Sequence, residues 1–293
     1  MSLTPPFSLI RELVVRALAE DLATGDITTD SLFASAVPAR GAIVAEEPEG
    51  LVVAGLAVAV EVFAQVDPTL KCTISLKDGD RAANSTVILI VSGDGRSMLK
   101  AERVALNFLQ RLSGIATLTA KFFNAVKGHH VKIVDTRKTT PGMRALEKWA
   151  VKLGGGFNHR HSLGDGILIK DNHLQLAGSD VAHACRLARE RAPHGLKIEV
   201  EAQTLDEVRA TLDGGADIIL LDNMSTPLIR MAVNLIKGRA VVDVSGGVTL
   251  ANVREIAAAG PDLISIGALT HSAPAVNLSM DIVRVRRQQS KTR

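Results

Sequence analysis

The sequence has no tyrosine, one tryptophan and two cysteines in 293 residues. Stacking on nucleic-acid bases needs aromatic side chains beside a basic stripe, which this composition does not supply. Cys72 and Cys185 lie far apart and have no His or Cys neighbours at metal-ligand spacing. This excludes a disulfide framework and a cysteine-based zinc site. We therefore expect a protein of a reducing compartment, the cytoplasm, that does not bind nucleic acid.

Long hydrophobic runs are missing as well. No stretch approaches the roughly 20 apolar residues that a membrane-spanning helix needs, and the most apolar one, 50–63, is interrupted by Gly55 and Glu61. The N-terminal segment has no basic region before an apolar core, so we expect no secretory signal and no membrane partner. The net charge of +3 is mild, and part of it lies in the C-terminal RVRRQQSKTR, which we expect to be the solvated end of a helix.

Two kinds of sequence meet near residue 114. Before it, periodic patterns predict helices over 8–20, 55–66 and 97–112 and short strands over 40–46, 71–76 and 86–91. A few strands packed with helices are typical of an α+β layer. The expected division is an α+β domain over 1–113, a second domain over 114–275, and a C-terminal helix and basic tail over 276–293.

The second part alternates apolar strands with helices. Strands are predicted over 131–135, 167–170, 197–201, 217–222, 240–245 and 262–267, a pattern typical of a parallel sheet covered by helices. A seventh strand cannot be placed from the pattern. The choice lies between an open doubly wound sheet and an α/β barrel. Because nearly every strand ends in a polar residue, and all strand ends of a barrel converge on one mouth, we favour the barrel.

Cationic residues are concentrated between 135 and 173. Arg144, Lys148 and Lys152 recur every four residues on an expected helix, and we interpret them as a solvated face. The other cations lie in loops or at strand ends, where they would repel one another unless an anion offsets them. Ion pairing with acids elsewhere is the alternative. The pattern favours a ligand with several negative charges, held by Arg137, Lys138, His159, Arg160 and Lys170.

Two glycine-containing turns indicate a phosphate site. Ser245, Gly246 and Gly247 follow one strand and precede a helix for which Thr249 is the expected N-cap. Backbone N–H groups in such a turn and at a helix start attract phosphate. The next strand is followed by a second turn that adds further N–H groups, at Ile266, Gly267 and Ala268.

Glu201 and Asp222 end neighbouring predicted strands. Carboxylates beside a phosphate site can hold Mg²⁺, bind sugar hydroxyls or stabilise developing positive charge. Glu199 lies two residues before Glu201, on the same strand face, and is either a supporting group or a buried acid paired with a lysine. The sequence contains no nucleophile motif and no Walker or dinucleotide-binding glycine motif.

Taken together, the motifs of this sequence resemble those of a known family, the quinolinate phosphoribosyltransferases. The similar segments, in order and spacing, are EDLATGDIT, AERVALNFLQRLSGIATLT, DTRKTTPGMRALEKWAV, GGGFNHR, ILIKDNH, ILLDN and SGGV. The resemblance implies the type II phosphoribosyltransferase fold, an N-terminal open sandwich followed by an incomplete, seven-stranded α/β barrel. It also implies a reaction with Mg²⁺, in which quinolinate and 5-phosphoribosyl-1-pyrophosphate give nicotinate mononucleotide, pyrophosphate and CO₂.

The resemblance also assigns residues. It implies a homodimer in which Arg103 reaches the partner's site and contacts quinolinate. Thr136, Arg137, Lys138, His159 and Arg160 would bind the quinolinate side, with Lys170 nearby. Glu201 and Asp222 would face the ribose and metal, and they join Lys138 and Lys170 as candidate catalytic groups. The phosphate would be held by Ser245, Gly246, Gly247, Ile266, Gly267 and Ala268.

Two departures and two alternatives remain. His161-Ser162 replaces a more usual apolar or glycine-containing pair, and Leu153 stands where cysteine is common, which leaves the shape of that loop open. One alternative is a related protein of molybdenum-transport gene clusters, which we expect to lack the lysine at position 170. The other is a non-catalytic phosphate-binding regulator, to which Glu201 and Asp222 would bring little benefit.

Overall fold

The computed structural model describes residues 4–178 and 180–285 and divides them into two compact units. Unit 1 holds residues 4–118, 141–154 and 273–285, and unit 2 holds residues 119–140, 155–178 and 180–272. The chain therefore returns to unit 1 twice after first leaving it. The predicted division into three consecutive segments does not contain these returns, because they depend on contacts between residues far apart in the sequence.

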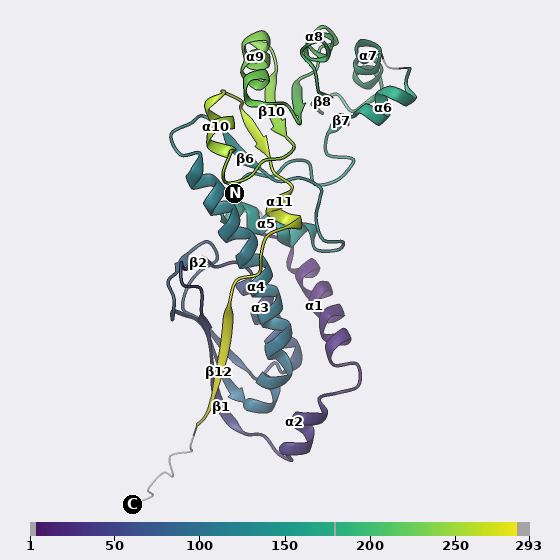
Figure 1. Cartoon of the computed structure of the whole chain (residues 1–293). Coiled ribbons are helices and arrows are strands. Elements are labelled where there is room, and N and C mark those ends of the chain that lie inside the picture. Colours follow the sequence, from purple (N-terminus) through teal and green to yellow (C-terminus); the bar gives the residue numbers. More distant parts are fainter. Residues whose placement is uncertain (1–3, 179, 286–293) are drawn as a thin grey trace, which may run out of the picture. The chain divides into compact units, whose positions relative to one another are not determined.

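Unit 1 contains a four-stranded antiparallel sheet with helices on one face (Figure 1). The strand order is β12 (Leu278–Arg284), β1 (Pro38–Ala45), β5 (Val87–Asp94) and β3 (Lys71–Ile74). A separate pair joins β2 (Leu51–Val52) to β4 (Arg81–Ala82). The helices are α1 (Phe7–Asp21), α2 (Ile27–Leu32), α3 (Leu56–Val66), α5 (Arg144–Leu153) and the first part of α4 (Gly95–Ala125), which continues into unit 2.

Helices α1, α3 and α4 form where the apolar periodicity predicts helices, whereas α2 was not predicted. In α1, Ile10, Val14 and Leu18 recur every four residues, and all three are buried on the face that contacts α3. Helix α4 is longer than predicted. Its Ser113 hydroxyl accepts a hydrogen bond from Ala54 N at 2.9 Å, and its Thr117 hydroxyl accepts one from Val52 N at 2.9 Å. Side chains of α4 thus complete the backbone hydrogen bonding of the β2 segment.

The predicted C-terminal helix is wrong in its described part. Residues Leu278–Arg284 form β12, which pairs antiparallel with β1 in a register that runs from Ala45↔Leu278 to Ala39↔Arg284. The Gln110 side chain of α4 also donates to the Leu278 carbonyl at 3.1 Å. Residues 38–45 and 278–284, far apart in the sequence, therefore share one sheet, a pairing that local periodicity does not reveal. Most of the predicted basic tail, residues 286–293, lies outside the described residues.

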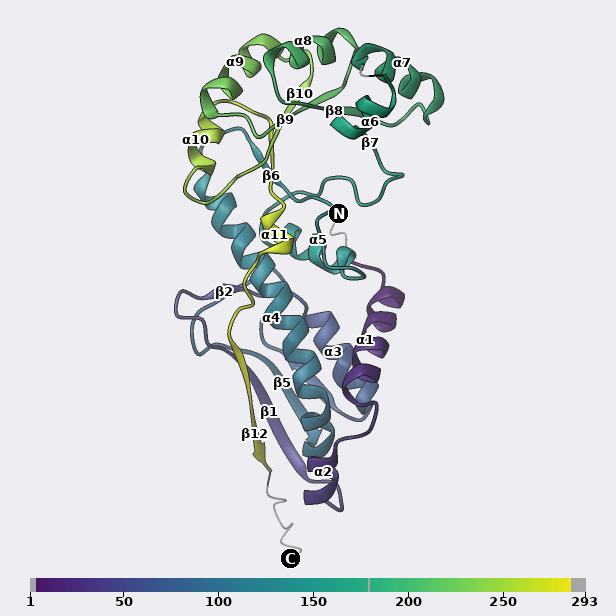
Figure 2. The same cartoon turned by 45° about the vertical axis from the view of Figure 1, so that its right-hand side comes forward.

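Unit 2 contains a parallel sheet of six strands in its described residues, in the order β6-β11-β10-β9-β8-β7. The helices α7 to α10 follow one another along one side of these strands (Figure 2). The strands are β6 (Lys132–Val134), β7 (Ile167–Ile169), β8 (Ile198–Ala202), β9 (Ile218–Asp222), β10 (Val241–Ser245) and β11 (Leu263–Ser265). The helices are α6 (Asp171–Leu176), α7 (Val181–Arg191), α8 (Leu205–Asp213), α9 (Thr226–Ile236), α10 (Val253–Ala258) and α11 (Ala268–His271).

A sheet closes into a barrel only where its two edge strands are joined, so the edges of this sheet concern the predicted seven-stranded barrel. Strands β6 and β7 are the two edges, and no ladder joins them in residues 4–178 and 180–285. Between them in the sequence, Phe157 makes an isolated parallel bridge to Val134, which is the nearest feature to a seventh strand in the described residues. The α/β class and the six placed strands are confirmed, and closure into a barrel stays a prediction.

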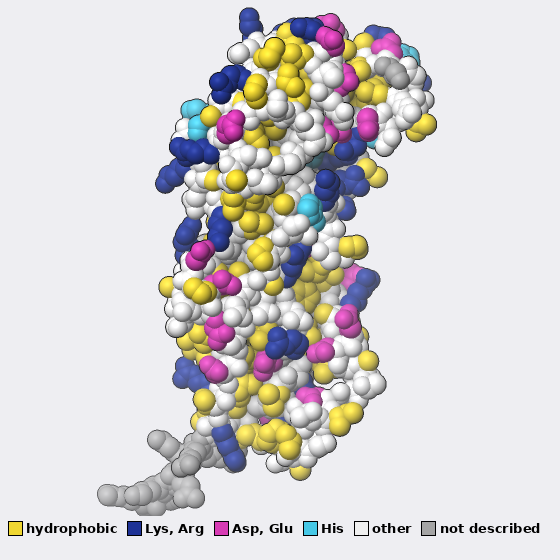
Figure 3. Space-filling model, in the orientation of Figure 1, with side chains coloured by type: hydrophobic (Ala, Val, Ile, Leu, Met, Phe, Trp, Pro, Cys, Tyr) yellow, Lys and Arg dark blue, Asp and Glu magenta, His cyan; other side chains and the backbone are white. Residues whose placement is uncertain are grey.

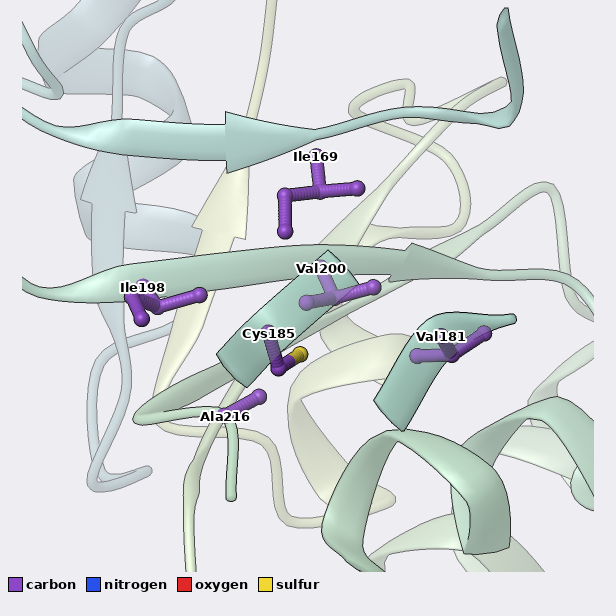
Figure 4. Packing of buried hydrophobic residues seen from close by; sticks show 6 residues of the cluster. All are labelled: Ile169, Val181, Cys185, Ile198, Val200 and Ala216. Carbon is purple, nitrogen blue, oxygen red and sulfur yellow. The ribbon is translucent and has the colours of Figure 1, made fainter. Parts of the chain in front are cut away.

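The two faces of the unit 2 sheet differ in polarity. On one face, Ile198 and Val200 of β8 pack with Ile169, Val181, Cys185 and Ala216 (Figure 4). Alternate residues of a strand point to opposite faces, so Glu199 and Glu201 lie on the other face. The register aligns Glu201 with Leu220 and Leu220 with Asp243, so these three residues share that face. We call this polar side the inner face, because the helices cover the apolar side.

The helix α5 corrects another prediction. Lys148, which the four-residue spacing placed on a solvated face with Arg144 and Lys152, has only 3% of its surface exposed. Its neighbour Glu147 is fully buried and forms an ion pair of 2.8 Å with Arg111 of α4. Charge periodicity alone therefore did not identify the buried side of this helix.

The surface carries charges of both signs. Figure 3 shows basic and acidic side chains interspersed on one face of the molecule. Among the helices of the described residues, none is both long enough and apolar enough to cross a membrane.

Gly114 of α4 gives a test of the packing in unit 1. A Cβ at this position would lie 2.1 Å from the Pro274 carbonyl oxygen, on the chain returning to unit 1. Gly114→Ala should lower the free energy of unfolding by about 1–2 kcal/mol, because overpacking outweighs the gain in helix propensity. The measurement is denaturant unfolding. The control is Gly195→Ala, where a Cβ would meet no atom of the described residues within 4 Å. A stabilised Gly114→Ala protein would contradict the packing.

Candidate active site

The strands of unit 2 bring the predicted acids and turns together at their C-terminal ends. Asp222 pairs with Ser245 across β9 and β10, and Ser245 pairs with Ser265 across β10 and β11. Glu201 stands at the end of β8, next to β9. Because the strands are parallel, these ends lie at one edge of the sheet, as the sequence predicted. The loops that carry the predicted cations belong to the same unit.

Lys170 and Glu201 form an ion pair at this edge. The Lys170 Nζ donates to Glu201 Oε2 at 3.1 Å, and the lysine side chain is 48% exposed while that of the glutamate is 9% exposed. Burial raises the pKa of Glu201, Lys170 opposes this, and the charge of nearby Asp222 raises it further. Glu201 and Asp222 therefore lie close enough to feel each other's charge. Asp222 itself accepts a hydrogen bond from the Asn223 side chain at 2.7 Å.

Arg137 and Arg160 lie close together despite their like charges. Burial lowers the pKa of the Arg160 guanidinium, the charge of Arg137 lowers it further, and the charge of Glu199 raises it. Arg160 donates to the Gly166 carbonyl at 3.0 Å. The buried Nε of Arg137 has no hydrogen-bond partner in the part of the chain that the structure describes. Two adjacent cations, one with an unpaired donor, form a site suited to an anion.

The loop between β6 and β7 is held by a buried acid. Asp135, fully buried after β6, accepts from the His159 backbone N–H at 2.9 Å and from the Asn158 side chain at 2.6 Å. The His159 ring then meets Glu199, with 2.8 Å between Nε2 and Oε2. The unusual His161-Ser162 pair is also ordered, because both backbone N–H groups donate to Asp165 at 2.8 Å.

Asp243 is a buried polar residue that the sequence reading missed. It lies in β10 on the inner face, is fully buried and accepts from the Ser265 hydroxyl at 2.7 Å. Burial and the nearby charge of Glu199 raise the pKa of Asp243 to about 7. The available signal was the polar residue inside the apolar strand VVDVS, two residues before the predicted phosphate turn.

The first glycine turn has the tight geometry that the sequence indicated. Gly246 has φ +93°, and a Cβ there would lie 2.2 Å from Asn223 Oδ1 and 2.9 Å from Asn223 N. Such a position accepts only glycine without rearrangement. The predicted N-cap at Thr249 is wrong, because α10 begins at Val253 after the N-cap Asn252. The Asn252 side chain instead holds the turn, accepting from Thr249 N at 2.8 Å and donating to the Gly247 carbonyl at 3.0 Å.

The second turn lies against the cationic segment. A Cβ at Gly267 would lie 3.0 Å from Lys138 Cδ, so Ile266, Gly267 and Ala268 adjoin this lysine. The Thr270 hydroxyl donates to the Lys138 carbonyl at 2.7 Å, and the Thr136 hydroxyl accepts from the Lys138 N–H at 3.1 Å. The predicted phosphate segment and the predicted diacid segment therefore adjoin within unit 2.

Arg103 stands apart from the other predicted residues. It is exposed on α4, beside Glu102, and belongs to unit 1, whereas the other predicted site residues belong to unit 2. Its role at a partner's site stays a prediction.

The fold and the site together define an α/β protein whose parallel strand ends and adjoining loops carry clustered cations, two acids and two glycine turns. Comparison with known families is consistent with this class. Residues 26–113 match the model of the quinolinate phosphoribosyl transferase N-terminal domain, and residues 115–281 match that of its C-terminal domain. The chain therefore belongs to the quinolinate phosphoribosyltransferase family.

Curated relatives and solved structures agree. The probable nicotinate-nucleotide pyrophosphorylase [carboxylating] of Bacillus subtilis is 41% identical over 273 residues, which cover 93% of each chain. The nicotinate-nucleotide pyrophosphorylase [carboxylating] of Mycobacterium leprae is 40% identical and covers 94% of this chain and 98% of its own. The nicotinate-nucleotide pyrophosphorylase structure from Francisella tularensis has a TM-score of 0.91 at 37% identity, covering 97% of this chain and 99% of its own.

Asp243 makes stability depend on pH. Its carboxyl has a folded-state pKa of about 7, against an ordinary value of 3.8. Between these values the folded protein keeps a proton that the unfolded chain loses, so this group's contribution to stability falls as pH rises towards 7. Asp243→Asn removes that dependence. Relative to the wild type, the free energy of unfolding of the variant should rise by up to about 4 kcal/mol between pH 4 and pH 8. The measurement is denaturant unfolding.

The control for this pH series is Asp206→Asn, which alters an exposed acid of α8. Its difference from the wild type should stay within about 0.5 kcal/mol at every pH. If the Asp243→Asn protein follows the wild-type pH profile in parallel, the buried acid is ionised in the folded protein and the account of this residue is wrong.

Proposed function

We propose that this protein is a quinolinate phosphoribosyltransferase, a pentosyltransferase of de novo NAD biosynthesis. It would convert quinolinate and 5-phosphoribosyl-1-pyrophosphate into nicotinate mononucleotide, pyrophosphate and CO₂. The observation that carries the proposal is the juxtaposition, in unit 2, of an anion-binding cation cluster with two acids and two glycine turns. Relatives that cover almost the whole chain carry the names of this activity.

The cation cluster fits the two carboxylates of quinolinate. Arg137 and Arg160 lie close enough that the charge of one lowers the pKa of the other. A dianion bound between them would offset this repulsion and satisfy the unpaired Arg137 Nε. In this proposal Thr136, Lys138, His159 and Lys170 complete the quinolinate side. A non-catalytic phosphate-binding regulator, the alternative function, would not need so many cations opposite two acids.

The glycine turns fit the phosphate of the ribosyl donor. The φ values of Gly246 and Gly247, +93° and +61°, belong to the left-handed region, in which successive N–H groups can form an anion-binding concavity. The second turn, at Ile266, Gly267 and Ala268, adjoins Lys138, which adds a positive charge. Ser245 precedes the first turn and neighbours Asp222 on β9. Phosphate and ribose would therefore be held by neighbouring strand ends.

The reaction then needs positioning and charge complementarity. The bond from ribose C1 to pyrophosphate breaks, its electron pair leaves with pyrophosphate, and the quinolinate nitrogen forms the new bond to C1. Glu201 and Asp222 stabilise the positive charge that develops on the ribose. The pyridinium ring then accepts the electron pair of the bond to its 2-carboxylate as CO₂ leaves, and a proton replaces the carboxylate. The cations hold the diacid in line for both steps.

The acids also fit a Mg²⁺ ion. Glu201 and Asp222 offer carboxylate oxygens, which Mg²⁺ prefers, and only one oxygen of Glu201 is bonded to Lys170. Mg²⁺ typically binds one or two carboxylates together with substrate phosphates, and in this proposal neighbouring strand ends would bring both together. Bound there, the ion would neutralise charge on the departing pyrophosphate.

The assembly and the compartment belong to the proposal as well. The proposed homodimer carries Arg103 of each chain to the quinolinate site of the other, where its exposed guanidinium would add a cation. A cytoplasmic location is consistent with two cysteines that are free in the structure, Cys72 and Cys185.

Arg160→Ala tests the quinolinate side. Removing one partner of a charged hydrogen-bonded pair costs about 2–5 kcal/mol, so the KM for quinolinate should rise at least tenfold. The KM for the phosphoribosyl donor should stay within about twofold, because this ligand is bound elsewhere at the site. Nicotinate mononucleotide, measured by chromatography, gives both constants.

Arg209→Ala is the matched control, because Arg209 is exposed on α8 and pairs only with Asp206 among the contacts the structure records for its side chain. It should keep both KM values. Nicotinate offered in place of quinolinate should give no product. Normal quinolinate turnover by Arg160→Ala, or wild-type turnover of nicotinate alone, would contradict the assignment.

Gly246→Ala tests the phosphate side. The added Cβ meets the Asn223 side chain and backbone, and φ +93° strains any residue with a Cβ. The KM for 5-phosphoribosyl-1-pyrophosphate should rise about tenfold, which corresponds to about 1.4 kcal/mol, and the KM for quinolinate should change less. Gly195→Ala is again the control. A Gly246→Ala protein with an unchanged donor KM would remove this turn from the site.

A further inference from the structure

Below the strand ends, three side chains meet on the inner face of unit 2. One ligand-type atom each of His159, Glu199 and Asp243 lies within 4.8 Å of the other two. Glu199 is 3% exposed and Asp243 is fully buried. Neither acid takes part in the reaction steps described above. A buried acid pair is costly unless each oxygen has a partner, so its presence here calls for a physical reason.

The hydrogen bonds of the two acids form a chain with a gap in the middle. Glu199 Oε2 meets His159 Nε2 at 2.8 Å, and Asp243 Oδ2 accepts from the Ser265 hydroxyl at 2.7 Å. The other oxygens, Glu199 Oε1 and Asp243 Oδ1, are buried and have no partner within residues 4–178 and 180–285. One proton carried by Asp243 and donated to Glu199 would satisfy both oxygens at once.

Asp243 is the acid that holds this proton. Its surroundings supply burial, the negative charge of Glu199 and a single hydroxyl, and they raise its pKa to about 7. Glu199 instead meets the imidazole of His159 at its other oxygen, and its charge acts on the guanidinium of Arg160. The chain then runs from Ser265 through neutral Asp243 and Glu199 to His159.

We propose that Glu199 and neutral Asp243 are positioning residues that hold the His159 ring toward the quinolinate carboxylates and set the affinity for that diacid. The inference rests on the proposed function, which supplies quinolinate as the ligand. A carboxylate hydrogen-bonded to Nε2 fixes the orientation of the imidazole ring, and so the direction in which the ring faces a substrate carboxylate. A neutral Asp243 adds no negative charge of its own beneath the dianion.

The charged groups that face this chain are consistent with the assignment. The guanidinium of Arg160 feels both Arg137 and Glu199, so Glu199 also offsets repulsion between the two arginines. Asp243 feels Glu199 and His159. Loss of the Glu199 charge should therefore weaken binding of the diacid through His159 and Arg160 together, and should leave the glycine turns unaffected.

Three variants test the chain: Glu199→Gln, Asp243→Asn and Asp243→Ala. Glu199→Gln keeps the shape and removes the charge, and should raise the KM for quinolinate about tenfold with the donor KM within about twofold. Asp243→Asn keeps a neutral group that donates to Glu199 and accepts from Ser265, and should stay within about threefold of the wild type. Asp243→Ala removes the link and should resemble Glu199→Gln.

Each variant is also melted with and without quinolinate, because the thermal shift reports diacid binding even where turnover is lost. If the KM for quinolinate rose as much in Asp243→Asn as in Asp243→Ala, the proposed hydrogen bond from a neutral Asp243 to Glu199 would be overturned. Equal rises in both KM values, or a fall in kcat alone, would overturn the positioning role. If the purified wild type contained one transition-metal ion per chain and Asp243→Asn lost it, a metal ion rather than a proton would join the two acids. That result would overturn the proposal. A wild type that does not turn over quinolinate contradicts the proposed function itself.

Discussion

The alternation of apolar and polar residues along the strands of unit 2 is the constraint on which the site depends. In β8, Ile198, Val200 and Ala202 are fully or almost fully buried, whereas Glu199 and Glu201 point to the opposite face. Parallel strands covered on both faces usually read as continuous apolar runs. Here the acids on the inner face cannot pack as a hydrocarbon core, so that face must be occupied by hydrogen-bond partners, counter-ions and ligands.

The counter-ions come from one loop region and one strand end. Lys170 binds Glu201, and the loop held by Asp135 delivers His159 to Glu199. Arg137 and Arg160 lie in the same loop region, where the charge of Arg137 acts on the Arg160 guanidinium and the charge of Glu199 acts on it in the opposite direction. The result is a surface whose acids suit a cationic transition state and whose cations suit an anionic ligand. Both features lie within unit 2, so each follows from the geometry of that unit alone.

Much of the fold could be predicted from the sequence because its signals are local. The six strands of unit 2 and the helices α1, α3 and α4 appear where the periodicity placed them, and the glycine turn at Gly246 has the conformation its residues indicated. Nonlocal features were missed. The strand β12 pairs with β1, which lies far from it in the sequence, and Lys148 is buried in the middle of α5 together with Glu147. Thr249 fits the N-cap pattern, yet α10 starts later, after Asn252.

The site shows the same limit. Cations and acids at strand ends were visible as residue types, so Lys170, Glu201 and Asp222 could be grouped by their positions in the sequence. Asp243 could not, because a single aspartate inside an apolar strand gives no hint that Glu199 lies near it, two strands away. The central claim is that one face of unit 2 binds a pyridine diacid and an activated ribose together. Its most direct test is the release of labelled CO₂ from quinolinate labelled in the 2-carboxylate. One CO₂ per nicotinate mononucleotide, dependent on both 5-phosphoribosyl-1-pyrophosphate and Mg²⁺, is the result the account predicts. Release without the ribosyl donor, or no release at all, would contradict it.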